Sequence, residues 1–240
     1  MAFFYRLKNS FSLVLKEIID RKKIRLITLT AITIYWTTFF SSIIIIGLFR
    51  NNGYSPFNNL ISDLGSIEYS PFPFLFDIGC IIAGFLSFPI SVYIFSYIRE
   101  NSKGVKNNKT ILNFLTYILL FSGILGDIGF VGIGFFSIDR NPLNIHFIFA
   151  SFLFVGYFLS AFLVGILVLL FKIRLNKNIG ILGLFVSISI FFIYILLILL
   201  KINFIFFEWI ADFSLLMWLY TFLYSILRNN NEERNNLKQI

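Results

Sequence analysis

Residues 179–200 read IGILGLFVSISIFFIYILLILL, a run without a single charged side chain. At 1.5 Å per residue a helix of this length reaches roughly 33 Å, enough to cross the ~30 Å hydrocarbon layer of a membrane. The chain is therefore expected to be an all-α integral membrane protein, a bundle of six transmembrane helices. Five further runs have the same character: Leu26–Leu48, Pro71–Ile98, Ile111–Phe136, His146–Phe171 and Glu208–Leu227.

The overall composition agrees with this architecture. Hydrophobic residues make up 58% of the chain and aromatic residues 20%, whereas charged residues make up only 13%, unlike a soluble domain. The polar segments between the runs are short, so we expect no separate soluble domain. The predicted organisation is a cytoplasmic interfacial segment at residues 1–25, the transmembrane domain at residues 26–227 and a cytoplasmic polar tail at residues 228–240.

The positions of the charges predict an orientation. Lys and Arg residues number seven before the first run, four between the second and third, three between the fourth and fifth, and three after the sixth. The other side carries only Arg50, Arg140 and Lys201. We therefore expect a cell-membrane protein, and by the positive-inside rule both of its termini face the cytoplasm. The net charge of +8 then reflects topology and contact with anionic membrane lipid, so we expect no nucleic-acid partner.

Two local patterns outside the runs predict further helices. Tyr54-Ser55-Pro56-Phe57 recurs as Tyr69-Ser70-Pro71-Phe72, and Ser followed by Pro favours a helix start. The first copy predicts a short helix that ends near Gly65, and the second predicts the start of the second span. Residues Phe11–Arg25 fit an interfacial helix on the inner leaflet, with a polar extension of the first span as the alternative.

Carboxylates inside the spans are the first candidates for function, because a charge in hydrocarbon is costly and usually faces the bundle interior or water. Asp127 lies in the third span among five glycines. It serves binding or catalysis, or is protonated and bonded to a neighbouring helix, or lies near water. For Asp77 and Asp212 the alternative to a binding role is structural hydrogen bonding, and for Glu208 it is an ordinary helix-start carboxylate.

His146 is the only histidine and Cys80 the only cysteine. A general base, a phosphate partner and an interfacial anchor are the open roles for His146. A single histidine excludes a three-histidine zinc site, and we expect neither a metal nor a cofactor. Ser62 and Asp63 are adjacent and cannot readily flank one imidazole as a catalytic triad requires. The chain also has no phosphate-binding loop and no Gly-x-Ser-x-Gly elbow.

The polar candidates share a location, since all of them map to the predicted outer half. They predict one pocket that opens outward, with Asp127 as its floor and the Ser62-Asp63 loop as its lid. Such a mixture of groups suits a headgroup or a small polar ligand. The predicted ligand-binding residues are Asn59, Ser62, Asp63, Asp77, Asp127, Arg140, His146, Glu208 and Asp212.

The segment YSPFNNLISDLG at residues 54–65 resembles the signature of a prokaryotic membrane family called domain of unknown function 998. A second match is GIGFF at residues 132–136 followed by HFIFA at residues 146–150, although the family usually has Phe-Pro where this chain has Phe136-Ser137. Both pieces are distantly similar to the Frag1/DRAM group in the six-span layout, and some of its members act in lipid-anchor remodelling. The resemblance supports Ser62, Asp63 and His146 as site residues more than any activity.

Three functions follow from these observations. The first is binding, with or without modification, of a lipid or lipid-linked headgroup, with Asp127 or His146 as the base and Asp63 fixing the loop. The second is a small-solute or proton-coupled transporter with Asp127 as a relay. The third is a non-catalytic assembly protein. Catalytic activity, the ligand and the oligomeric state are left open by the residues.

Overall fold

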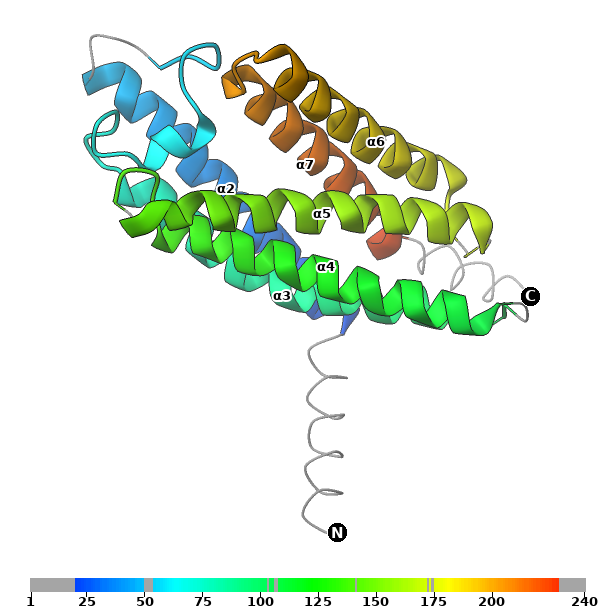
Figure 1. The fold of residues 1–240 in the computed structure, drawn as a ribbon. Helices are drawn as coiled ribbons and strands as arrows, with labels where there is room; N and C mark the ends of the chain where they lie inside the picture. The colour runs from blue at the N-terminus through cyan, green and yellow to red at the C-terminus, as the bar shows by residue number, and fades with distance from the viewer. Residues whose placement is uncertain are drawn as a thin grey trace.

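A computed structural model describes residues 20–49, 54–102, 104–105, 108–140, 142–171, 173 and 175–228. Within these ranges six helices are long and apolar enough to cross a membrane, as the sequence predicts (Figure 1). The chain is thus an integral, multi-pass membrane protein. Most of the predicted interfacial helix, nearly all of the polar tail, and Arg50 lie outside the described residues. The helices are α2 (Arg21–Phe49), α3 (Phe74–Asn101), α4 (Lys109–Phe135), α5 (Ile145–Leu170), α6 (Lys177–Leu200) and α7 (Ile205–Arg228).

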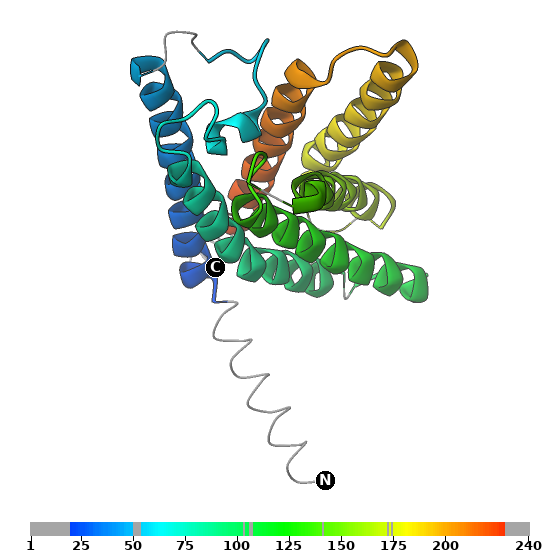
Figure 2. The same cartoon turned by 60° about the vertical axis from the view of Figure 1, so that its left-hand side comes forward.

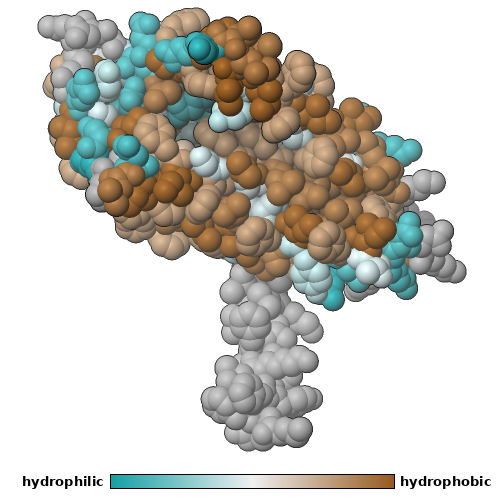
Figure 3. Space-filling view, viewed as in Figure 1, coloured by the Kyte–Doolittle hydropathy of each residue, from teal (hydrophilic) through white to brown (hydrophobic). Residues whose placement is uncertain are grey.

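Helices that follow one another in the chain pack side by side, and α5 also contacts α7 (Figures 1 and 2). The 3-10 helix η1 (Ile61–Gly65) packs on α2 and α3. A second short 3-10 helix, η2 (Pro142–Asn144), precedes α5. Side chains on the viewed face are mostly apolar between two more polar ends (Figure 3), as expected for a surface that meets lipid.

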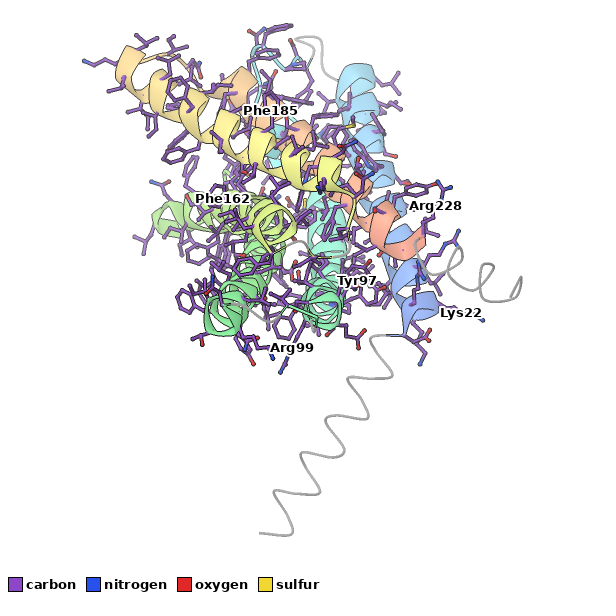
Figure 4. The ribbon with its side chains drawn as sticks, turned by 90° about the vertical axis from the view of Figure 1, so that its right-hand side faces the viewer. Lys22, Tyr97, Arg99, Phe162, Phe185 and Arg228 are labelled. Carbon is purple, nitrogen blue, oxygen red and sulfur yellow. The ribbon has the colours of Figure 1, made fainter. Side chains whose placement is uncertain are left out.

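The two ends of the bundle differ in charge. Lys22, Arg99 and Arg228 lie at the end where α2 begins and α7 ends, called the basic end below (Figure 4). The opposite end carries η1 and the α4–α5 and α6–α7 connections, and is called the η1 end. The positive-inside rule predicts that the basic end faces the cytoplasm.

The glycines of the third span bring α4 against its neighbours, as their spacing predicts. Gly126 of α4 and Gly156 of α5 lie opposite each other, and a Cβ atom at Gly129 would collide with the backbone of Phe149 and Leu153. A close α4–α5 contact therefore forms the most tightly packed helix pair of the bundle. This contact fixes the position of α5, which lines the cavity described below.

Helix α6 contacts α5 near the basic end and leaves it toward the η1 end. Gly180 and Gly183 of α6 approach Gly165 and Ala161 of α5 closely. Beyond Ile190, α6 has no buried residue, and Figures 1 and 2 show its path away from α5. Because no small residues hold α6 against α5 there, the side of α5 near the η1 end is left without a covering helix, whereas Tyr194 of α6 still contacts Phe207 of α7.

Two predicted helix starts are wrong in position. Ser55 and Pro56 open a turn, in which the amides of Asn58 and Asn59 donate to the Ser55 carbonyl at 3.0 and 2.9 Å, and the short helix begins only at Ile61. It ends at Gly65, as predicted. Helix α3 begins at Phe74 rather than Pro71. The reason is Pro73, because a residue that precedes proline is disfavoured in helical conformation.

Candidate functional site

The Ile-Ser-Asp-Leu-Gly segment folds into η1 through its own aspartate. The backbone amide of Leu60 donates to Oδ2 of Asp63 at 2.9 Å, and the Asp63 amide donates back to the Leu60 carbonyl at 3.2 Å. The Tyr54 hydroxyl donates to the same carbonyl. Burial raises the pKa of the Asp63 carboxyl above its ordinary value, although the Leu60 amide opposes the shift. Asp63 therefore acts as a cap that shapes the loop.

On one side η1 is attached to the first turns of α7. Nε1 of Trp209 donates to the Asn59 carbonyl at 2.8 Å, and the Glu208 carboxylate faces the backbone amides of Ile61 and Ser62. Two adjacent residues of α7 thus bind the loop from below. Glu208 lies in the first turn of α7, and its carboxylate is also a hydrogen-bond acceptor for the first amides of η1.

On the other side η1 is attached to α3 and to the α4–α5 connection. Arg140 donates to the Gly65 carbonyl at 2.6 Å and pairs with the Asp77 carboxylate. The Ser137 hydroxyl donates to the same Gly65 carbonyl at 2.6 Å. The Arg140 guanidinium lies 4.3 Å from the centre of the Phe74 ring. Gly65 is required here, because a Cβ atom at this position would collide with the Asp77 carboxylate.

Asp139 completes this attachment from the α4–α5 connection. Its Oδ2 accepts from the Ser66 hydroxyl at 2.8 Å and from the amides of Ile67 and Glu68 at 2.6 and 3.3 Å. Burial acts to raise the pKa of Asp139, but these hydrogen bonds outweigh it and hold the pKa below the ordinary value. The segment 54–68 is therefore a lid, tied to α7 on one side and to α3 and Asp139 on the other.

A cavity lies beneath the lid and extends into the bundle. The centre of a water-sized sphere can occupy about 110 Å³ of it, where a single water needs about 10–15 Å³. Along α7 the lining runs from Glu208 to Leu223, about 22 Å at 1.5 Å per residue. The cavity is thus long and narrow. Figure 3 shows a hollow near the η1 end on the face where α6 has left α5.

The polar lining gathers at the η1 end of the cavity. Asp77, His146 and Glu208 lie near the starts of their helices, and Asp212 lies one turn deeper on α7. The Tyr35 hydroxyl of α2 donates to Oδ2 of Asp212 at 3.3 Å. Nδ1 of His146 lies 2.6 Å from the Phe136 carbonyl, which orients the ring at the start of α5. The other polar lining residues at this end are Ser62 and Ser137.

The rest of the lining is mostly apolar. The polar residues of the deeper wall are Thr28, Ser87, Tyr157 and Tyr220. Its aliphatic and aromatic residues include Ala31, Ile32, Ala83, Ile90, Phe130, Leu153, Phe154, Leu215, Leu216, Leu219 and Leu223. The cavity therefore changes along its axis from polar beneath the lid to apolar near the basic end.

Asp127, expected from the sequence at the floor of the pocket, lines a second cavity beside this one. It is fully buried, and its Oδ1 accepts from the Tyr157 hydroxyl at 2.8 Å. This smaller cavity of about 60 Å³ adjoins the larger one and shares six lining residues with it: Ser87, Ile90, Tyr157, Leu215, Leu219 and Leu223. Oδ2 of Asp127 makes no hydrogen bond of standard geometry, although Ser87 and Ser91 place hydroxyl groups near the carboxyl group. Asp127 thus lies behind Tyr157, bonded to a neighbouring helix.

The structure brings five of the nine predicted residues to one cavity: Ser62, Asp77, His146, Glu208 and Asp212. Asn59, Asp63 and Arg140 do not line it, because their polar groups are directed into the lid and its attachments. Sequence reasoning missed Tyr35, Tyr220 and Ser137 as lining residues. A tyrosine inside an apolar span is a weak signal, because tyrosine is also common at the membrane surface.

Metal binding has no support in the described residues, where no group of three His, Cys, Asp or Glu side chains is arranged to hold an ion. Cys80 is buried and free of disulfides, and it lines the cavity on α3. The arrangement offers hydrogen-bond acceptors and carboxylates at one end and a hydrophobic wall at the other. It is suited to binding an elongated molecule with one polar end.

Comparison with known protein families matches residues 37–224 to the model described as "Protein of unknown function (DUF998)". The chain belongs to the DUF998 family. The match includes the whole lid and the described cavity lining except the α2 residues before Trp36. Comparisons with curated proteins and with solved structures gave no match. The similarity to the Frag1/DRAM group stays a prediction.

Proposed function

We propose that this DUF998 protein binds a single-chain amphiphilic lipid, with the headgroup beneath the lid and the chain in the apolar part of the cavity. The observation that carries the proposal is the change in lining along one continuous cavity, from Glu208 and His146 at the η1 end to Leu219 and Leu223 near the basic end. A lipid is the common membrane molecule that has a polar group at one end and an apolar chain at the other.

The dimensions favour one chain rather than two. The lining extends about 22 Å along α7, comparable with the ~30 Å hydrocarbon thickness of a membrane. The space open to the centre of a water-sized sphere is only about 110 Å³, so a narrow chain fits better than a diacyl lipid.

The path of α6 supplies a route of entry. Near the η1 end α6 leaves α5, and its residues Phe191, Phe192 and Leu199 are exposed by 68%, 68% and 72%. The side of α5 is therefore bordered by lipid there instead of by a packed helix. A membrane lipid reaches the cavity sideways, without passing through water.

The lid has a supporting role in this function. Asp63, Asn59 and Arg140 determine the shape and attachment of segment 54–68, which closes the cavity at its polar end. This structural role explains why the loop carries polar residues, and it requires no catalytic role for them.

The test uses an amphiphile that carries a photoreactive diazirine on its alkyl chain, added to the protein in nanodiscs. We expect cross-links at Leu215 and Leu219, which line the cavity, and we expect excess unlabelled amphiphile to abolish them. Cross-links at Met217 on the same helix, which is 69% exposed, should persist because bulk lipid is not saturable. Peptide mass spectrometry distinguishes these positions.

A pair of variants on α5 provides the control. Ala150→Phe fills the cavity that Ala150 lines and should remove the competed cross-links. Val155→Phe adds the same ring on the 57% exposed face of the helix and should retain them. Equal cross-linking of Leu219 and Met217, with no competition at either position, would overturn the proposal.

A further inference from the structure

We infer that the cavity selects an amphiphile whose headgroup is positively charged, an ammonium group bound by Asp212 and the surrounding aromatic rings. This inference rests on the proposed function and names the headgroup class that the same site takes. It goes beyond that function because the change from polar to apolar lining alone would fit a neutral or anionic headgroup equally well.

The first argument is the balance of charge. Three carboxylates line the cavity, those of Asp77, Glu208 and Asp212, while none of the described lining residues is Lys or Arg. Arg140 approaches Asp77 from the lid side and is engaged there with Asp77, Gly65 and Asp139. An anionic headgroup would meet carboxylates without a facing cation, and like charges at short range repel.

The second argument is that the three carboxylates are not equivalent. Asp77 has Arg140 as its counter-charge, and Glu208 faces two amides of the lid. Asp212 has neither. The Asp212 carboxylate accepts a hydrogen bond from the Tyr35 hydroxyl at 3.3 Å, and this hydroxyl is a neutral donor near the limit of hydrogen-bond distance. Asp212 is therefore the lining carboxylate with the greatest capacity left for a cationic partner.

The third argument is the aromatic surroundings of Asp212. Tyr35, Phe130 and Tyr220 line the same cavity, and the rings of Tyr35 and Phe130 meet edge to face with centroids 5.5 Å apart. Tyr220 is close enough to Asp212 for an electrostatic interaction. Aromatic faces attract ammonium groups, and this attraction strengthens where water is excluded. A carboxylate beside Tyr35 and Tyr220, with Phe130 against the Tyr35 ring, matches a quaternary or primary ammonium better than a hydrated metal ion.

The experiment extends the cross-linking assay with three competitors that share a dodecyl chain and differ in headgroup: dodecyltrimethylammonium, dodecanol and dodecyl sulfate. The wild-type protein in nanodiscs should be protected at Leu219 at the lowest concentration by dodecyltrimethylammonium. We expect a separation of about tenfold from dodecanol, equivalent to about 1.4 kcal/mol, and a larger separation from dodecyl sulfate. Equal protection by all three would overturn this inference while leaving the proposed function intact.

Asp212→Asn tests the residue itself. The amide keeps the size of the side chain and an oxygen that accepts from Tyr35, so the neutral competitor should protect as before. The advantage of dodecyltrimethylammonium over dodecanol should fall to about twofold or less, since the negative charge is gone. An unchanged advantage would show that Asp212 is not the binding group. Loss of all competed cross-linking in the wild type would instead remove the proposed function.

Discussion

The Tyr157 hydroxyl of α5 donates to Oδ1 of the fully buried Asp127 on α4 at 2.8 Å, within the most closely packed helix pair. Asp127 is therefore a partner in helix packing, placed behind the wall of the larger cavity instead of in it. Tyr157 lines both cavities, so its hydroxyl group links the Asp127 carboxyl group to the wall of the larger one.

This hydrogen bond should contribute measurably to stability. We expect Tyr157→Phe to cost about 1 kcal/mol, the scale found for polar contacts between membrane helices. Asp127→Leu should remove the same contact, so the two changes together should cost less than their sum. Unfolding in mixed micelles at rising SDS fraction measures all three. Strict additivity would show that the pair does not interact.

Close packing of α4 on α5 makes a second prediction. Gly129→Ala should destabilise the bundle by about 1–3 kcal/mol, because the added Cβ would overlap the backbone of α5. Gly47→Ala is the matched control, since no atom lies within 4 Å of its added Cβ and alanine favours helix. The same unfolding assay compares them. Equal effects at the two glycines would contradict the described α4–α5 contact.

The lid gives a third prediction, which separates a capping role from a charge role for Asp63. Asp63→Ala should cost about 1 kcal/mol, the usual loss when a cap is removed. Asp63→Asn should cost less, because its oxygen still accepts from the Leu60 amide, and because burial has raised the pKa of the native carboxyl, so that its charged form is disfavoured. Thermal denaturation in detergent at neutral pH is the measurement. A larger loss for Asn than for Ala would exclude capping.

Asp139 gives a prediction about acid. Hydrogen bonds to the lid hold its pKa below the ordinary value, so its ionised form stabilises the folded state at neutral pH. This contribution is complete above the unfolded pKa and is lost as the pH falls through the lowered folded pKa. The stability difference between wild type and Asp139→Asn should therefore be constant near pH 7 and shrink below about pH 4. A difference that grows on acidification would reverse the assigned sign.

The helices could be read from the sequence because a membrane requires long apolar runs, and Ile179–Leu200 differs from the observed α6 by only two residues at its start. Exact starts were less predictable. Pro71 and Pro73 are both compatible with a first turn, and only the structure shows that the helix begins after the second. The divergence of α6 from α5 was not predicted at all, because it depends on where small residues end in two helices at once.

The candidate site was predictable as a location but not as a set of roles. The free-energy cost of a charged side chain inside the membrane is enough to single out Asp77, Glu208 and Asp212, and these three residues do line one cavity. Asp63 and Arg140 are also charged, but the direction of each side chain depends on the fold of a five-residue helix and of a connection about 75 residues away along the chain. The sequence predicts Asp127 at the floor because no pattern in it indicates the Tyr157 hydrogen bond that holds the carboxyl group at the α4–α5 contact.

Native mass spectrometry of the protein released directly from membranes tests the central claim most directly, since it reports what occupies the cavity. The wild type and Val155→Phe should retain one single-chain amphiphile per protein, whereas Ala150→Phe should retain none. If all three proteins carry the same adducts, or if only two-chain lipids remain bound, the cavity beneath the lid does not hold the ligand and the account is wrong.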